Sequence, residues 1–268
     1  MELNGLGDPL RLQAAGVAQL DDYLPGLSAT GAIGMQPAAA AAPAESVVAA
    51  LVGMAFEARI AAGPGVLVMC RDSEHELSAT LTKAINRGCR NIISFGVAGG
   101  LAPHLRPGDW IVASSIIDAN QVRPTDKTWT KRLLQMMPGA GHAPIAGVDA
   151  AVVHPKDKRH LHVTTGAATV DIESHLVARL ASTHGMNFAA VRVVVDPAHR
   201  VVPGAALAGM QPGGGTSVMA VLRELMARPS ELAGLLRVAV DAYAARSALL
   251  RARRMLGPHF GFADSGKA

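Results

Sequence analysis

Apolar residues in the chain from residue 46 onward fall into two alternating patterns. Continuous apolar runs, typical of strands buried on both faces, occur at Val47–Gly53, Gly65–Cys70, Asn91–Phe95, Trp110–Ile116, Ala167–Val170 and Phe188–Val195. Helical spacing of apolar residues predicts helices at Glu74–Arg87, Lys127–Met137, Glu173–His184, Ser217–Ala227 and Glu231–Leu256. Such alternation predicts the α/β class, a three-layer α/β/α sandwich with a mixed, largely parallel central sheet.

The ends of the chain have a different composition. An alanine run bracketed by Pro37 and Pro43 is typical of a linker. We therefore expect residues 1–45 to form a flexible N-terminal extension. Residues 46–258 are then one domain and residues 259–268 a tail, with a loop at Pro203–Gly215 inside the domain.

Composition narrows the class of protein. The formal net charge is +4 and aromatic residues make up 3%, so we expect no nucleic-acid partner. Cys70 and Cys89 are too few for a disulfide framework and suit a reducing cytoplasm. No apolar run reaches the ~18 residues of a membrane span, and no secretory signal is evident. These features predict a cytoplasmic location.

A metal site is not expected from the histidines. His154, His160 and His162 stand among charged residues, which indicates an exposed loop, and the chain shows no second cluster of ligands.

Candidate chemistry lies where predicted strands end, because ligands of parallel α/β sheets bind at the carboxyl ends of the strands. The strand at Asn91–Phe95 runs into Gly96, Gly99 and Gly100, where the backbone could approach a ligand closely. Pro103 follows, which argues against the helix that a dinucleotide site requires. A plain tight turn is the alternative.

Acidic residues follow two other strands. Glu173 could accept hydrogen bonds from vicinal hydroxyls such as those of ribose. The alternative is that Asp171 or Glu173 supports the helix N-terminus. Asp196 ends an apolar strand before a proline, where a partly desolvated carboxyl could act as a general acid; a turn-forming aspartate is the alternative.

A third polar pair follows the first strand. Arg59 could hold a phosphate through its planar guanidinium, with Glu57 close to it in the chain. A solvated helix start explains this pair equally well.

Taken together, these segments resemble the purine nucleoside and uridine phosphorylase superfamily over residues 46–215. The chain is most similar to the branch that holds methylthioadenosine/S-adenosylhomocysteine nucleosidases and hopanoid-associated phosphorylases. The resemblance depends on Gly53–Arg59, Gly96–Gly100, Asp171–Ser174 and Arg192–Asp196.

The resemblance implies a role for each matching residue. Asp196 donates a proton to the leaving purine. Glu173 holds the ribose hydroxyls, with Ile172 in place of the usual methionine. Ala98 and Gly99 line the base and ribose pocket. Our own mechanistic hypothesis adds Arg192 as a substrate contact. In it, Arg59 with the Gly53 backbone places phosphate or orients a water through Glu57.

Two departures affect the phosphate site. Val97 stands where the family often has a hydroxyl residue, and Ser94 stands where phosphorolytic members carry an arginine. Both changes weaken the case for the usual phosphate contacts.

The C-terminal third resembles the tail of hopanoid-associated phosphorylases, which release adenine from adenosylhopane. Basic and apolar side chains share the segment between Ala242 and Ala263, which has no acidic residue. Such a helix could lie on an anionic membrane surface. An ordinary solvated helix with one face on the core is the alternative. The basic residues are Arg246, Arg251, Arg253 and Arg254, and the apolar ones are Leu249, Leu250, Met255 and Leu256.

The resulting hypothesis is phosphorolytic release of adenine from adenosylhopane in hopanoid biosynthesis. Inorganic phosphate is then the co-substrate, with no other cofactor, and we expect a homo-oligomer. A hydrolytic nucleosidase is the first alternative. A non-catalytic module that binds a small or lipid-linked nucleoside is the second.

Overall fold

A computed structural model describes residues 47–70, 74–119, 121–204, 223 and 232–262. The predicted extension at residues 1–45 lies outside the described residues, as do most of the predicted loop Pro203–Gly215 and all of the predicted helix Ser217–Ala227 except Arg223. The residues from Glu45 onward group into one compact unit.

Within the described residues, the strands form one eight-stranded sheet. Its order is β2-β1-β3-β7-β6-β4-β5, and β8 pairs with both β3 and β4. The strands are β1 (Val48–Val52), β2 (Val66–Cys70), β3 (Asn91–Gly100), β4 (Trp110–Asp118), β5 (Gln121–Pro124), β6 (Gly141–Gly147), β7 (Thr169–Asp171) and β8 (Asn187–Asp196).

The pairing closes part of the sheet on itself. β3 pairs with β7, β7 with β6, β6 with β4, β4 with β8, and β8 with β3 again. Five of the eight strand pairs in the described sheet are parallel, whereas β3/β7, β4/β5 and β4/β8 are antiparallel. The prediction of a mixed, largely parallel sheet is therefore confirmed.

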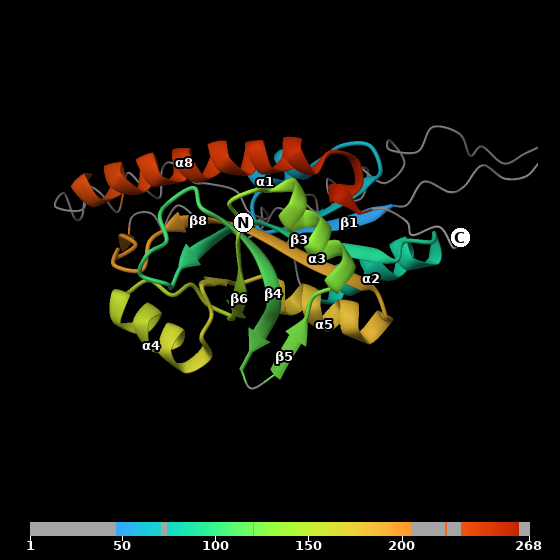
Figure 1. Ribbon diagram of the computed structural model, residues 1–268, viewed down its shortest axis with the longest axis horizontal. Coiled ribbons are helices and arrows are strands. Elements are labelled where there is room, and N and C mark those ends of the chain that lie inside the picture. The colour runs from blue at the N-terminus through green and yellow to red at the C-terminus, as the bar shows by residue number, and fades with distance from the viewer. Residues whose placement is uncertain (1–46, 71–73, 120, 205–222, 224–231, 263–268) are drawn as a thin grey trace, which may run out of the picture. The chain divides into compact units, whose positions relative to one another are not determined.

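Helices cover both faces of this sheet, which confirms the three-layer sandwich (Figure 1). Apolar residues of α1 (Ala55–Ala61), α3 (Lys127–Met136) and α8 (Leu232–Leu256) pack on one face. Residues of α2 (Glu74–Asn86) and α5 (Ser174–His184) pack on the other. Alternate residues of one strand serve both cores, as Ala49 and Leu51 face one and Val48 and Ala50 the other. Such double burial explains why the strands appear in the sequence as continuous apolar runs.

The expected exposed loop around His154 and His160 is instead a helix, α4 (Pro155–Thr165). The sequence pattern did not predict this helix, because most of its residues are polar and no apolar stripe marks a buried face. The helix begins with Pro155 and ends at Gly166, which has the left-handed backbone (φ 70°) that favours glycine.

The boundary predicted between the domain and the tail, at residue 259, lies too early in the chain. Phe260 is fully buried, its ring lies edge-on to Phe95 at 4.9 Å, and its carbonyl accepts a hydrogen bond from Trp129 Nε1 at 2.9 Å. The chain therefore remains part of the core through the short 3-10 helix η3 (Pro258–Gly261).

The apolar side chains proposed for membrane contact pack inward instead. Leu249 and Leu256 are buried in the core formed with β8 and α1, and Arg253 donates to the carbonyl of Ala61. This half of α8 is an ordinary helix with one face on the core. No helix in the described ranges has the length and apolar content that a membrane crossing requires.

Candidate active site

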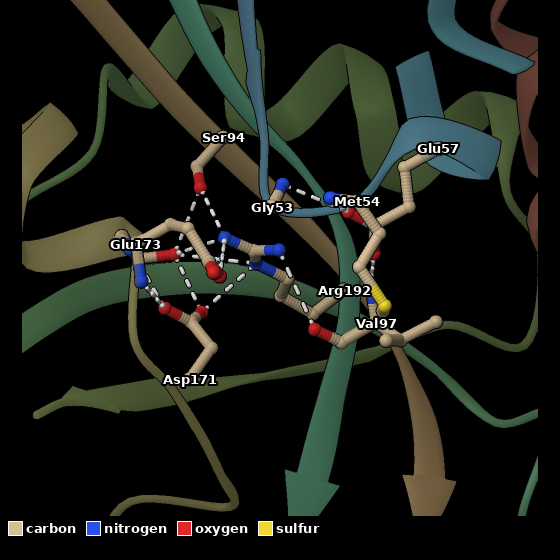
Figure 2. Close-up of polar contacts among 9 residues, drawn as sticks. Gly53, Met54, Glu57, Ser94, Val97, Asp171, Glu173 and Arg192 are labelled. Carbon is tan, nitrogen blue, oxygen red and sulfur yellow. Dashed lines mark hydrogen bonds and ion pairs between the residues drawn. The ribbon is translucent and has the colours of Figure 1, made fainter. Parts of the chain in front are cut away.

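Glu57 is a buried carboxyl in the first turn of α1, with 1% of its surface exposed. One oxygen accepts the backbone N–H groups of Gly53 and Met54, each at 2.8 Å, and the other accepts that of Val97 at 2.7 Å (Figure 2). Burial raises the pKa of Glu57, while Arg192 and these N–H groups act in the opposite direction. One carboxylate, that of Glu57, thus joins the carboxyl end of β1 to the glycine-rich part of β3.

Arg192 of β8 is the cation at the centre of the site, and its side chain is fully buried. Nε lies 2.9 Å from a carboxylate oxygen of Asp171, and Nη2 lies 3.4 Å from one of Glu173. Nη2 also donates to the Ser94 hydroxyl at 2.6 Å. A buried charge is tolerated when it is paired and hydrogen-bonded in this way.

Asp171 and Glu173 divide the two roles that the sequence left open. Asp171 accepts hydrogen bonds from the backbone N–H groups of Glu173 (2.9 Å) and Ser174 (2.6 Å), so it supports the start of α5. Glu173 makes no side-chain capping bond, and its carboxylate points toward Arg192 (Figure 2). Asp171 therefore serves the start of α5, whereas Glu173 faces the buried cation Arg192.

Two glycines make this convergence possible. A methyl group on Gly53 would lie 2.4 Å from a Glu173 oxygen. One on Gly96 would lie 2.5 Å from both Arg192 Nη1 and Glu57 Oε1. Because these two residues have no side chain, the three charged groups can occupy the space beside them. β3 continues through Gly96, Gly99 and Gly100 as a strand, so the alternative of a tight turn there is wrong.

Asp196 lies at the other end of the same glycine segment. It pairs in register with Gly99, whereas Arg192 pairs with Gly96. Burial raises the pKa of Asp196, and the positive charges of Lys158 and Arg200 partly offset this effect. A cavity of about 310 Å³ beside the segment after Asp196 is lined by His199, Arg200, Val201, Gly234 and Arg237.

Of the predicted site residues, Glu57, Glu173 and Arg192 lie together around Gly53 and Gly96, and Asp196 lies beside Gly99. Arg59 is exposed and lies two residues from Glu57 on α1, so it points to another side of the helix. Ile172 is partly buried between Asp171 and Glu173, and Ala98 is buried in β3 beside Gly99. The structure thus does not place Arg59 with the proposed phosphate contacts.

Several members of the site were not predicted from the sequence. Ser94 and Ser174 lie 3.0 Å apart and bind Arg192, and Lys158 reaches Asp196 from α4. Ser94 stood in the sequence as a buried hydroxyl inside an apolar run, which was a usable signal for a polar partner. Lys158 carried no such signal, because it stands among other charged residues.

The described residues contain no cluster of three or more His, Cys, Asp or Glu side chains suited to a metal ion. The site instead places carboxyls in different environments around Gly53 and the glycines of β3. Two carboxyls in different environments can divide the work, because one can supply a proton while the other holds hydroxyl groups.

These features define a three-layer α/β protein whose acidic candidate site lies at the carboxyl ends of β1, β3 and β8. A sequence model of the phosphorylase superfamily matches residues 35–233, and the chain belongs to this superfamily. No curated protein sequence matches the chain.

Solved structures share the fold at low sequence identity. The futalosine hydrolase of Helicobacter pylori is 16% identical with a TM-score of 0.54, covering 78% of this chain and 97% of that one. The 5'-methylthioadenosine/S-adenosylhomocysteine nucleosidase of H. pylori is 16% identical with a TM-score of 0.55, covering 79% and 97%. The corresponding S. pneumoniae nucleosidase is 14% identical with a TM-score of 0.52, covering 78% and 97%.

Proposed function

We propose that this protein cleaves the N-glycosidic bond of a purine nucleoside. The observation that carries the proposal is the placement of two carboxyls around the glycines at the strand ends: Glu173 is buried beside Gly53, and Asp196 is partly buried beside Gly99. Arg192, which pairs with Glu173, lies beside Gly96 of the same β3 segment. The solved nucleosidases of H. pylori and S. pneumoniae were crystallised with immucillin inhibitors, so the shared fold accommodates nucleoside-like ligands.

Each carboxyl then has a separate task. Cleavage builds positive charge on the sugar and negative charge on the departing base, so a general acid near the purine accelerates it. Asp196 supplies that proton because burial raises its pKa. Glu173 accepts hydrogen bonds from the ribose hydroxyls, held in place by Arg192. Glu57, with its raised pKa, activates the attacking nucleophile.

Water fits this site better than phosphate as the nucleophile. Three carboxyls surround Arg192, so the cluster has no excess positive charge to attract an anion. The backbone N–H groups of Gly53 and Val97, which could have cradled a phosphate, already donate to Glu57. We therefore favour hydrolysis, with Glu57 as the base that orients a water.

Purine release should proceed at the same rate with and without inorganic phosphate. The experiment incubates the purified chain with 5'-methylthioadenosine or adenosylhopane and follows free adenine by chromatography. In ¹⁸O-labelled water, the sugar product should carry the label at the anomeric oxygen. A phosphate requirement with a sugar phosphate product would establish phosphorolysis. Absence of adenine release from both nucleosides under all conditions would favour a non-catalytic binding module.

More specifically, the substrate that we propose is a purine nucleoside with a large apolar substituent, such as adenosylhopane. The supporting feature is the outer face of α8 in its first half, which differs from the face expected from the sequence. Four large side chains follow one another there at helical spacing and are 49% to 71% exposed: Leu232, Leu236, Val240 and Tyr243. Exposed arginines continue the helix surface at Arg246, Arg251 and Arg254. An anionic membrane surface could receive both the apolar side chains of the first half of α8 and the arginines of the second half.

Leu236→Glu/Val240→Glu should weaken binding to phosphatidylglycerol vesicles at least ~10-fold, because two apolar contacts are replaced by charges that anionic lipid repels. Cosedimentation with the vesicles measures this. Val163→Glu is the matched control, since Val163 is 76% exposed but lies on α4. Equal sedimentation of all three proteins, or no sedimentation of the unaltered chain, would rule out this membrane contact.

A further inference from the structure

Lys158 is a fully buried lysine on the otherwise polar helix α4. Its neighbours Lys156, Arg159 and His160 are exposed, so the helix turns this one cation toward the protein interior. A buried ammonium group is costly unless it is paired and hydrogen-bonded. The partners of Lys158 therefore indicate why the residue is there.

The ammonium group of Lys158 has three acceptors. It forms an ion pair with Asp196 Oδ2, and it donates to the carbonyls of Pro197 at 3.1 Å and Arg200 at 3.3 Å. An ammonium group has three N–H donors, and all three are used here. Lys158 is thus engaged entirely with the end of β8 and the segment that follows, and has no donor left for a ligand.

The carboxyl of Asp196 also borders the glycine segment. A methyl group on Gly99 would lie 3.4 Å from Asp196 Oδ1 and 3.5 Å from Oδ2, so this carboxyl borders the space that glycine leaves open. Because Lys158 occupies Oδ2, the oxygen that can meet a ligand is Oδ1.

We propose that Lys158 is a positioning residue for the general acid, holding Asp196 Oδ2 so that Oδ1 is directed at the purine. This role for Lys158 rests on the proposed function, since it assigns Lys158 to the same site. Lys158 also ties α4 to residues 196–200, so the acid and the segment after β8 are held together.

The charged groups that act on Asp196 are Lys158 from α4 and Arg200 from the segment after β8. Arg200 is itself paired with Asp241 of α8. Both cations lower the pKa of Asp196 against the larger effect of burial. Asp196 acts in its protonated form, so the rate of purine release falls as pH rises through this pKa. Removing the positive charge of Lys158 moves this falling limb to higher pH.

Lys158→Met should lower kcat by ~10²-fold with little change in KM, since a misplaced catalytic group costs rate more than binding. The falling limb of the pH profile of kcat should also move to higher pH. Lys156→Met, on the exposed side of the same helix, should match the unaltered protein in both respects. Wild-type kcat with an unshifted limb in Lys158→Met would overturn the proposal.

A double variant keeps the test decisive if Lys158→Met does not fold. Lys158→Met/Asp196→Asn removes both charges together, which avoids an unpaired buried ion. If Lys158 acts through Asp196, this variant releases purine at the rate of Asp196→Asn alone. A further loss comparable to that in the wild-type background would show that Lys158 acts elsewhere.

A measurement without substrate separates this proposal from the proposed function. Carboxyl ¹³C NMR titration of Asp196 should show a higher pKa in Lys158→Met than in the unaltered chain, whether or not the chain cleaves nucleosides. An unshifted Asp196 resonance overturns the role of Lys158. A shifted resonance in a chain that releases no purine from any nucleoside would instead refute the proposed function alone.

Discussion

Asp196→Asn should lower the rate of purine release by ~10²–10⁴-fold, the usual contribution of a general acid. The amide cannot deliver the proton that the departing purine requires. The structure supports this role because burial raises the pKa of Asp196 while Lys158 keeps the carboxyl in place. Single-turnover release of adenine from a purine nucleoside measures the effect directly.

A substrate with a different leaving group provides the control. The p-nitrophenolate of p-nitrophenyl riboside leaves without being protonated. Asp196→Asn should therefore cleave this substrate at close to the rate of the unaltered protein. Equal loss on both substrates would mean that the substitution disturbs the site as a whole. Unchanged release of adenine would remove Asp196 from the mechanism.

Arg192→Met should reduce the free energy of unfolding by ~3–5 kcal/mol, because it leaves buried carboxyls without their cation. Arg192 is fully buried and pairs with Asp171 at 2.9 Å and Glu173 at 3.4 Å. Urea unfolding at neutral pH measures the loss. Arg123→Met is the matched control, since that arginine pairs with Asp118 at 3.3 Å where both side chains are 21% exposed. Such a pair contributes at most ~1 kcal/mol.

The loss in Arg192→Met should also depend on pH. Arg192 lowers the pKa of Glu57, so removing it raises that pKa further above its ordinary value of 4.5. A carboxyl whose pKa is raised by folding favours the folded state fully below the unfolded value and loses this contribution as pH rises through the folded value. The variant should therefore be closest to the unaltered protein in acid and fall behind as pH increases. A difference that is constant from acid to neutral pH would show that Arg192 does not set the ionisation of these carboxyls.

Several features of the site were predictable because they follow from local rules. Glu57 follows β1 and Asp196 ends β8, and both strands run parallel to β3, so their carboxyl ends meet at one edge of the sheet. Glu173 also follows a recognisable strand, but β7 is antiparallel to β3, so its place in the site depends on the strand pairing. The closeness of Glu57 to Val97, forty residues away in the chain, depends on β1 pairing directly with β3. Only the strand order supplies that information.

Arg59 and Lys158 show the limit of local reasoning. Arg59 is close to Glu57 in the chain, but helical geometry turns it to the exposed side of α1. Lys158 stands in a charged stretch that indicates solvent, and yet α4 packs with this residue facing Asp196. The sequence contains no periodic signal for either outcome, because the orientation of a short polar helix is set by its neighbours in space.

The amino-acid sequence by itself determined the α/β class, most strand and helix positions and the carboxyls of the candidate site. These follow from apolar periodicity and from residues at strand ends, which are properties of short segments. The tertiary structure alone decided the closed circuit of strands, the inward face of α8, the grouping of three carboxyls around Arg192 and the pairing of Lys158 with Asp196. Those contacts join residues far apart in the chain, so their energies arise only when the packed layers bring them together.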